Sequence, residues 1–155
     1  MSSETIVTGI FLISAVIAVG IMINSIFPII YTTADTFGSM SHQADEKMRT
    51  DIKIVNTYAS SPSSVKIWLK NVGTANIHTN MLDTSDIFIG PVGNFERKSL
   101  AGLYTIEEST NGYWDSGETL SITNTSSIFW NEGDVIYFSI VLSNGVTRSE
   151  KFTSD

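Results

Sequence analysis

The spacing of hydrophobic residues divides the chain into two parts. The first part, Thr5 to Ala34, has no charged residue and carries apolar side chains at every angular position of a helix. A bilayer core of roughly 30 Å requires about 20 apolar residues in a helix. Residues 6–26 supply such a run. We therefore predict a membrane-spanning helix within residues 1–34. Its large apolar anchor residues are Ile6, Phe11, Ile13, Val16, Ile17, Ile21 and Ile23.

Two alternatives to a membrane helix fit the segment less well. A cleaved secretory signal has a basic region followed by a shorter apolar run, whereas here no Lys or Arg precedes a longer run. A core helix of a soluble domain is rarely apolar on every face. Pro28 lies near the far end of the run and predicts a bend there.

The next segment, residues 35–50, predicts a helical stalk. Its apolar residues Phe37, Met40, Ala44 and Met48 recur at spacings of three and four, with charged residues between them. This narrow stripe suits packing on the chain's own domain or against a partner helix, and the sequence leaves both open. Gly38 argues against one unbroken helix through both segments.

From residue 51 to residue 155 the hydrophobic period changes from that of a helix to alternation. Short alternating runs separated by turn residues predict strands. The expected strands are residues 51–58, 65–71, 87–89, 99–106, 119–123, 135–142 and 146–152. Asn144-Gly145 is a hairpin signal, because both residues tolerate positive φ. About seven short strands without a helical period predict an all-β sandwich of immunoglobulin-like architecture.

The composition of this domain limits its partners and excludes disulfides. The chain from Asp35 onward carries all nine basic residues and fifteen of the sixteen acidic ones, a net charge of −6. Nucleic acid and anionic lipid need a basic footprint, so neither is expected as the main partner. The chain has no cysteine, so its core must be stable without disulfides.

The sequence does not fix the side of the membrane on which the domain lies. Lys47, Arg49 and Lys53 follow the membrane helix, and the positive-inside rule would place them inside. However, these cations lie at the limit of the rule's range, and neighbouring carboxylates match them.

No residue pattern predicts an active site, a cofactor or a metal centre. His42 and His78 have no second ligand at metal-binding spacing, and no local signature presents a serine nucleophile. Residues 114–118 and 131–134 form acidic loops whose oxygens suit Ca²⁺, although solvated turns have the same composition. Asn124-Thr125-Ser126 is a glycosylation sequon. We predict that the chain is not an enzyme.

Several short motifs occur in a defined order along the chain. After the N-terminal anchor they are MRTDIKI (residues 48–54), WLKNVG (68–73), DIFIG (86–90) and WDSGETL (114–120), followed by the Asn144-Gly145 hairpin. This order resembles the archaellum accessory protein G family over almost the full chain. Accessory protein F and the archaellins share the layout of one N-terminal helix and a sandwich.

The resemblance implies a structural role in the archaeal swimming motor. It implies a single-pass protein of the cell membrane whose sandwich lies outside the cytoplasm and acts as a stator. The implied partners are accessory protein F and the surface-layer protein, with a homo-oligomer or filament formed through the sandwich. This orientation runs against the positive-inside count.

An alternative is an archaellin or type IV pilin-like filament subunit that packs through its N-terminal helix. Such subunits carry a basic leader before the apolar run, whereas this sequence starts Met-Ser-Ser-Glu. The expectation is therefore an accessory protein.

The three tryptophans are the candidate interface residues. Trp68 falls on the polar face of its predicted strand, and Trp114 and Trp130 fall in predicted loops. A large aromatic ring on a surface favours a protein contact, although each ring can instead fold back onto the core.

Overall fold

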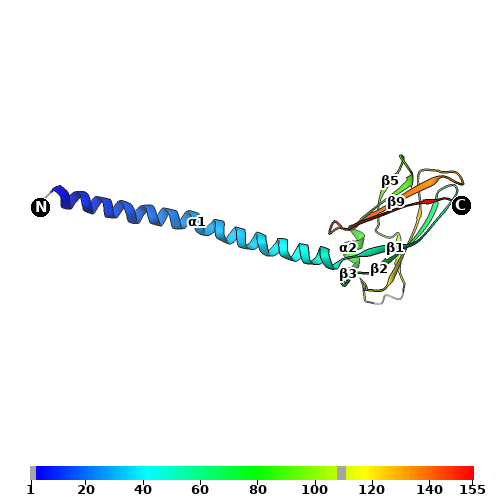
Figure 1. Ribbon diagram of the computed structural model, residues 1–155, viewed down its shortest axis with the longest axis horizontal. Coiled ribbons are helices and arrows are strands. Elements are labelled where there is room, and N and C mark those ends of the chain that lie inside the picture. The colour runs from blue at the N-terminus through cyan, green and yellow to red at the C-terminus, as the bar shows by residue number, and fades with distance from the viewer. Residues whose placement is uncertain (1–2, 108–110) are drawn as a thin grey trace. The chain divides into compact units, whose positions relative to one another are not determined.

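The computed structural model describes residues 3–107 and 111–155, and the chain divides into two compact units, Met1–His42 and Gln43–Asp155 (Figure 1). The helix α1 runs from Ser3 to Arg49. The predicted membrane helix and the predicted stalk are therefore one helix, and neither Pro28 nor Gly38 ends it. The hydroxyl of Thr32 donates a hydrogen bond to the carbonyl of Pro28, 2.9 Å away.

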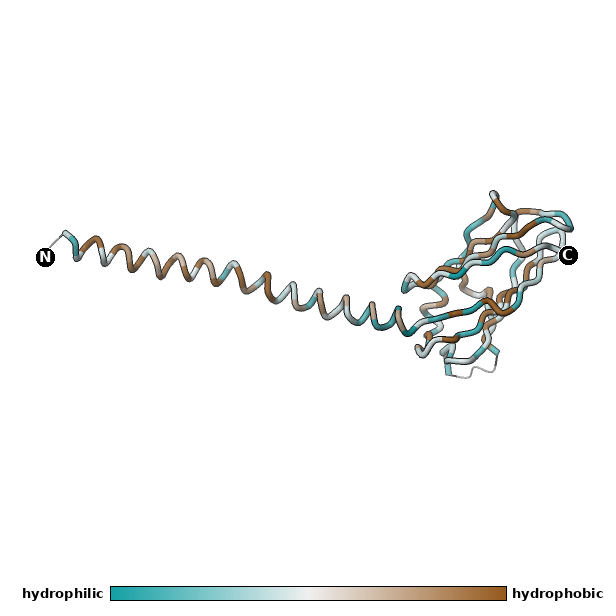
Figure 2. Tube along the Cα trace, in the orientation of Figure 1, coloured by the Kyte–Doolittle hydropathy of each residue, from teal (hydrophilic) through white to brown (hydrophobic). Residues whose placement is uncertain are grey.

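No described residue of α1 forms part of a core. Figure 2 shows hydrophobic colour along most of the helix and hydrophilic colour in its last turns. All seven predicted anchor residues are exposed, with fractions from 47% to 73%. The hydroxyls of Thr8, Ser14 and Ser25 each donate to the carbonyl four residues earlier, which satisfies them without water. The helix is long and apolar enough to cross a membrane.

The unit Gln43–Asp155, called the head here, contains ten strands and one short helix among its described residues. In chain order they are β1 (Ile52–Ser60), β2 (Ser64–Asn71), β3 (Ile77–His78), α2 (Thr79–Asp83), β4 (Asp86–Pro91), β5 (Glu96–Ser99), β6 (Tyr104–Ile106), β7 (Tyr113–Trp114), β8 (Thr119–Thr125), β9 (Val135–Val141) and β10 (Thr147–Thr153). The predicted helix followed by a β-sandwich is confirmed.

The head is built from two antiparallel sheets of four strands. Their strand orders are β1-β2-β8-β6 and β10-β9-β4-β5, and β3 pairs with β7 in a small third sheet. Alternate residues of the strands point inward, because successive side chains of a strand lie on opposite faces. The resulting core includes the fully buried residues Ile67, Leu69, Ile87, Ile89, Leu120, Ile136, Phe138 and Ile140.

Three details differ from the sequence prediction. The predicted strand 99–106 is two strands, β5 and β6, which belong to different sheets and are separated by a turn. The strands β3 and β7 have two residues each, too few for alternation to be recognised. The five-residue helix α2 was also missed, because only the side chain of His78 marks its start, by accepting a hydrogen bond from the Asn80 N–H.

The edges of the sheets are bridged by long basic side chains. Arg148 of β10 donates to the Ile52 carbonyl of β1 at 3.0 Å, and its guanidinium pairs with Asp51. Lys98 of β5 donates to the Thr125 carbonyl of β8 at 2.6 Å. Charged residues on edge strands oppose strand addition by other chains. Contacts through sheet faces are therefore favoured over pairing at these edges.

The expectation that all three tryptophans are exposed is wrong for two of them. Trp114 and Trp130 are buried, at 0% and 3% exposure. The indole Nε1 of Trp114 donates to the Glu118 carbonyl at 3.0 Å. Trp68 is partly buried on the outer face of β2. The two loop tryptophans therefore contribute to the core, and only Trp68 remains an interface candidate.

We expect Trp114→Ala to lower the free energy of unfolding by about 3 to 5 kcal/mol, because it leaves a cavity and removes an internal hydrogen bond. Trp68→Ala should lower it by less than about 1 kcal/mol, because the ring is partly solvated. Thermal melting of the full chain in detergent, followed by near-ultraviolet circular dichroism, measures both. Equal losses for the two variants would contradict the assigned burial.

Candidate interaction surfaces

Three of the sequence motifs meet in one cluster where α1 passes into β1. We define this junction cluster as residues 49–51, 71–75 and 114–118, together with Asn144. Its first set of hydrogen bonds holds the chain after the helix. The Asp51 carbonyl accepts from the N–H groups of Val72 and Gly73, and the Arg49 carbonyl accepts from those of Thr74 and Ala75, at 2.9 to 3.1 Å. The helix end is therefore bonded to the loop after β2.

The side chain of Asn71 links the second and third motifs. Asn71 is fully buried, and its Nδ2 donates to the carbonyls of Ala75 and Trp114 at 2.9 and 3.0 Å. The Ser116 hydroxyl donates to the Gly73 carbonyl at 2.6 Å, and the Gly117 N–H donates to the Asn71 carbonyl at 2.8 Å. Each of these donors is satisfied only when the segments lie together.

Two further contacts complete the cluster. Asn144, in the β9–β10 hairpin, donates from Nδ2 to the Thr50 hydroxyl at 3.0 Å. A Cβ atom at Gly73 would overlap the Arg49 carbonyl oxygen and the Asp51 nitrogen. Glycine is therefore required at residue 73 by the close approach of two backbones.

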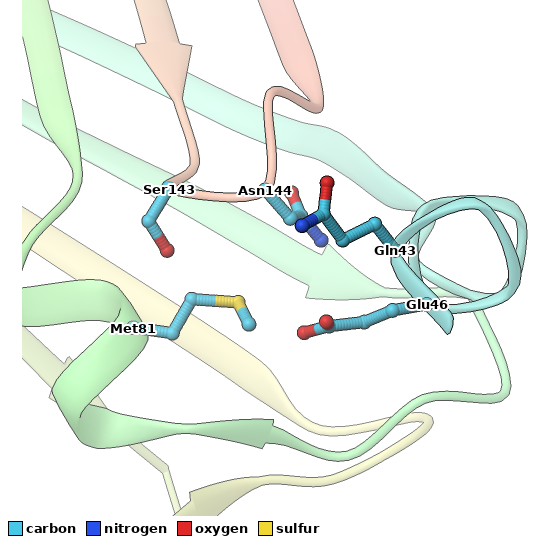
Figure 3. A pocket seen from close by; sticks show the side chains of 5 residues that line it. All are labelled: Gln43, Glu46, Met81, Ser143 and Asn144. Carbon is cyan, nitrogen blue, oxygen red and sulfur yellow. The ribbon is translucent and has the colours of Figure 1, made fainter. Parts of the chain in front are cut away.

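A polar pocket lies beside this cluster (Figure 3). It has a volume of about 360 Å³ and is lined by Gln43, Glu46, Met81, Ser143 and Asn144. Figure 3 shows the Glu46 carboxylate and the Met81 thioether extending into the same space from α1 and α2. The pocket is therefore a polar hollow lined by residues of α1, α2 and the β9–β10 hairpin.

A second surface, here called the aromatic hollow, lies on the outer side of sheet β10-β9-β4-β5. It is lined by Val92, Gly93, Phe95, Tyr137 and Lys151, with a volume of about 230 Å³. The Phe95 ring contacts the Tyr137 ring at a centroid distance of 5.4 Å. The exposed fraction is 50% for Phe95 and 53% for Val92. An exposed aromatic cluster of this kind is typical of a protein contact.

The residues considered for chemistry have structural partners. His78 caps α2 and packs edge-on against Tyr113, with ring centroids 4.8 Å apart, while His42 lies exposed on α1. In the acidic loops, the Glu118 carboxylate accepts from the Asp115 N–H and the Asp134 carboxylate from the Asn131 N–H, both at 2.8 Å. Among the described residues, no group of three or more potential metal ligands occurs.

The sequon asparagine is not accessible in the folded head. Asn124 is 5% exposed, and its Oδ1 accepts from the Lys98 ammonium at 3.3 Å. A glycan is a bulky, solvated modification. The folded conformation therefore does not present Asn124 for glycosylation.

Two titratable groups of the head have shifted pKa values. Partial burial raises the pKa of Glu96, but hydrogen bonds from Ser127, Ser126 and Lys98 outweigh it and hold that pKa below its ordinary value. Burial, together with a hydrogen bond to Asp83, raises the pKa of the Tyr104 phenol to about 12. Glu96 therefore joins β5 to the loop after β8 as a carboxylate, and Tyr104 remains a neutral donor.

Comparison with known proteins identifies the relatives of this chain. A family model described as archaeal-type flagellin matches residues 2–153. An uncharacterized protein of Archaeoglobus fulgidus is 30% identical over an alignment of 162 positions. The alignment covers 99% of each chain.

Three solved structures similar to this chain come from archaeal motility machinery. The archaellum periplasmic stator protein FlaG of Sulfolobus acidocaldarius is 25% identical, with a TM-score of 0.54, covering 66% of this chain and 99% of that one. The stator complex of FlaF and FlaG from the same organism matches with 25% identity and a TM-score of 0.52, covering 65% and 87%. The archaeal flagellum of Methanospirillum hungatei matches at 11% identity and a TM-score of 0.68, covering 100% and 94%.

Glu96→Gln should destabilise the head at neutral pH and not in acid. Because the pKa of folded Glu96 is depressed, its carboxylate stabilises the head above the ordinary pKa of 4.5, and this contribution disappears as the pH falls through the folded pKa. The measurement is the difference in melting temperature between the native chain and the variant, from pH 7 to pH 3. The difference caused by Trp68→Ala, which involves no acidic group, should stay constant over that range.

Proposed function

The chain belongs to the archaeal-type flagellin family and is a structural component of the archaellum. Within the archaellum, we propose that it is a membrane-anchored, stator-like protein. In this role α1 attaches the chain to the membrane through its apolar residues. The head then lies outside the cytoplasm and binds fixed parts of the envelope or neighbouring archaellum proteins. Accessory protein F and the surface-layer protein are the proposed partners.

The likeness to the stator protein carries this proposal. It spans 99% of that protein's solved chain at 25% identity, whereas the likeness to the flagellar filament, at 11% identity, concerns the fold alone. Three of the four motifs that predicted the resemblance also build the junction cluster, which depends on Asn71, Gly73 and Trp114.

The physical demands of a stator agree with the structure of the head. A single helix rotates freely in lipid, so a protein that resists torque needs a second point of attachment. The hydrogen bonds of the junction cluster fix the last turn of α1 within the head unit. We assign protein binding to the aromatic hollow, whose exposed Phe95 and Val92 suit an apolar side chain of accessory protein F.

The second candidate is a filament subunit that packs through its N-terminal helix. At 1.5 Å per residue, 47 residues form a helix about 70 Å long, more than twice the thickness of a bilayer core. The filament structure also matches this chain over its whole length. Helix-to-helix packing in a filament would cover the apolar side chains of α1 as effectively as lipid does.

A motility experiment separates the two candidates. Cells that make the chain without residues 51–155 should still assemble filaments but should fail to swim, because torque has no fixed reference. Electron microscopy of the filaments and tracking of the cells measure the two effects. Normal swimming of these cells would refute the stator role, and loss of all filaments would favour the filament subunit.

An accessibility experiment tests the orientation of the head. Protease added to intact, wall-stripped cells should remove the head, while a cytoplasmic marker protein in the same cells stays intact. Protection of the head until the membrane is lysed would place it in the cytoplasm, as the positive-inside count does, and the stator role would then fail.

A further inference from the structure

One face of the head is basic although the head as a whole is acidic. The four strands β1, β2, β6 and β8 contain three lysines and no Asp or Glu. We define the basic face as the outward side of their sheet. Its residues are Lys53, Asn56, Tyr58, Lys66, Trp68, Lys70, Thr105, Thr119, Ser121 and Thr123. One acidic residue, Glu107, lies at the end of this face, where it follows β6 and donates its N–H to the Thr119 carbonyl. The sheet β10-β9-β4-β5, in contrast, carries both charge signs.

Two of these lysines form a like-charge pair. Lys53 and Lys70 are direct cross-strand partners, so their side chains lie on the same side of the sheet, and both are exposed. Like charges directly opposite each other destabilise an antiparallel pair. In the part of the chain that the structure describes, the four ion pairs use Arg49, Arg97, Lys98 and Arg148 instead. Among the described residues, Lys53 and Lys70 therefore have no ion-pair partner, and Glu107, beside Thr119, lies two strands from Lys70.

The third lysine is held in place by an aromatic ring. The Lys66 ammonium lies 4.9 Å from the centroid of the Trp68 ring, a cation–π contact. Lys66 and Lys70 are four residues apart on one strand, a separation of about 13 Å at 3.3 Å per residue. Positive charges thus lie at both ends of β2 on this face, at Lys66 and at the pair Lys53 and Lys70.

Hydroxyl groups flank the lysines on the next strand. Lys66, Trp68 and Lys70 of β2 lie opposite Thr123, Ser121 and Thr119 of β8, respectively. Lysine and serine are depleted in protein interfaces. Carboxylated sugars carry both an anionic group for lysine and hydroxyls for Ser and Thr. The composition of the basic face therefore favours an acidic saccharide over an acidic protein.

We propose that the basic face binds a carboxylated polysaccharide. The uncompensated pair Lys53 and Lys70 holds one carboxylate, Lys66 holds another, and Trp68 positions Lys66. The inference adds to the proposed stator role a fixed envelope polymer for the head to bind. Its test measures binding alone, so failure here would leave the motility and orientation results unaffected.

The test uses the full chain in nanodiscs of phosphatidylcholine, with polygalacturonate as the probe and binding measured by biolayer interferometry. Neutral dextran and poly-L-glutamate are the comparison polymers. We expect binding to polygalacturonate that weakens as salt is raised, weaker binding to poly-L-glutamate and none to dextran. The double variant Lys53→Gln/Lys70→Gln should lose at least about tenfold in affinity, because it removes two charged hydrogen-bond donors.

Matched variants keep the test specific. Lys47→Gln removes an exposed lysine of α1 and should change the affinity less than twofold, and Lys53→Arg/Lys70→Arg should retain most of the binding. Lys53→Gln alone should raise the melting temperature, because it relieves the like-charge pair. The proposal is overturned by equal binding to dextran, by equal or tighter binding to poly-L-glutamate, by an equal loss in Lys47→Gln, or by no binding at all. A lower melting temperature for Lys53→Gln would refute the like-charge premise.

Discussion

The apolar surface of α1 is the constraint on which the whole protein depends. A soluble domain covers such a surface with its own core, but no described residue of this helix is buried by the chain. Burial of apolar surface contributes about 25 cal/mol per Å². The chain therefore exists only in a setting where lipid or other helices cover α1. The proposed attachment to the membrane and the alternative packing in a filament would each meet this requirement.

The head meets a different requirement, because it must be stable in water without disulfides. It has no cysteine, so the inward residues of two sheets and the rings of Trp114 and Trp130 supply its stability. Polar side chains with several partners, such as Asn71, add specificity at the point where apolar packing stops. The core does not constrain the outward faces of the two sheets, and these faces differ in charge.

The uncharged apolar run was enough to predict the helix, and alternation was enough to predict most of the strands and the sandwich. A residue such as Val65 shows its direction in the sequence, because its neighbours Ser64 and Lys66 are polar. Trp114 and Trp130 could not be placed in this way. A ring in a loop has no period, and whether it turns inward depends on contacts such as the one to Glu118 that form only in the folded chain. The partners of the Asn71 side chain lie up to 43 residues away, and the like-charge pair needs the β1–β2 register.

The composition of the junction cluster has a consequence for the order of folding. Its members come from residues 49–51, 71–75, 114–118 and 144, so they span almost the whole head in sequence. Contacts at such separations form late, because the loops between them must close first. During synthesis α1 emerges before any of these partners exists. The last turn of the helix can therefore bond to the loop after β2 early, whereas its contact with Asn144 completes the cluster only when the β9–β10 hairpin is made.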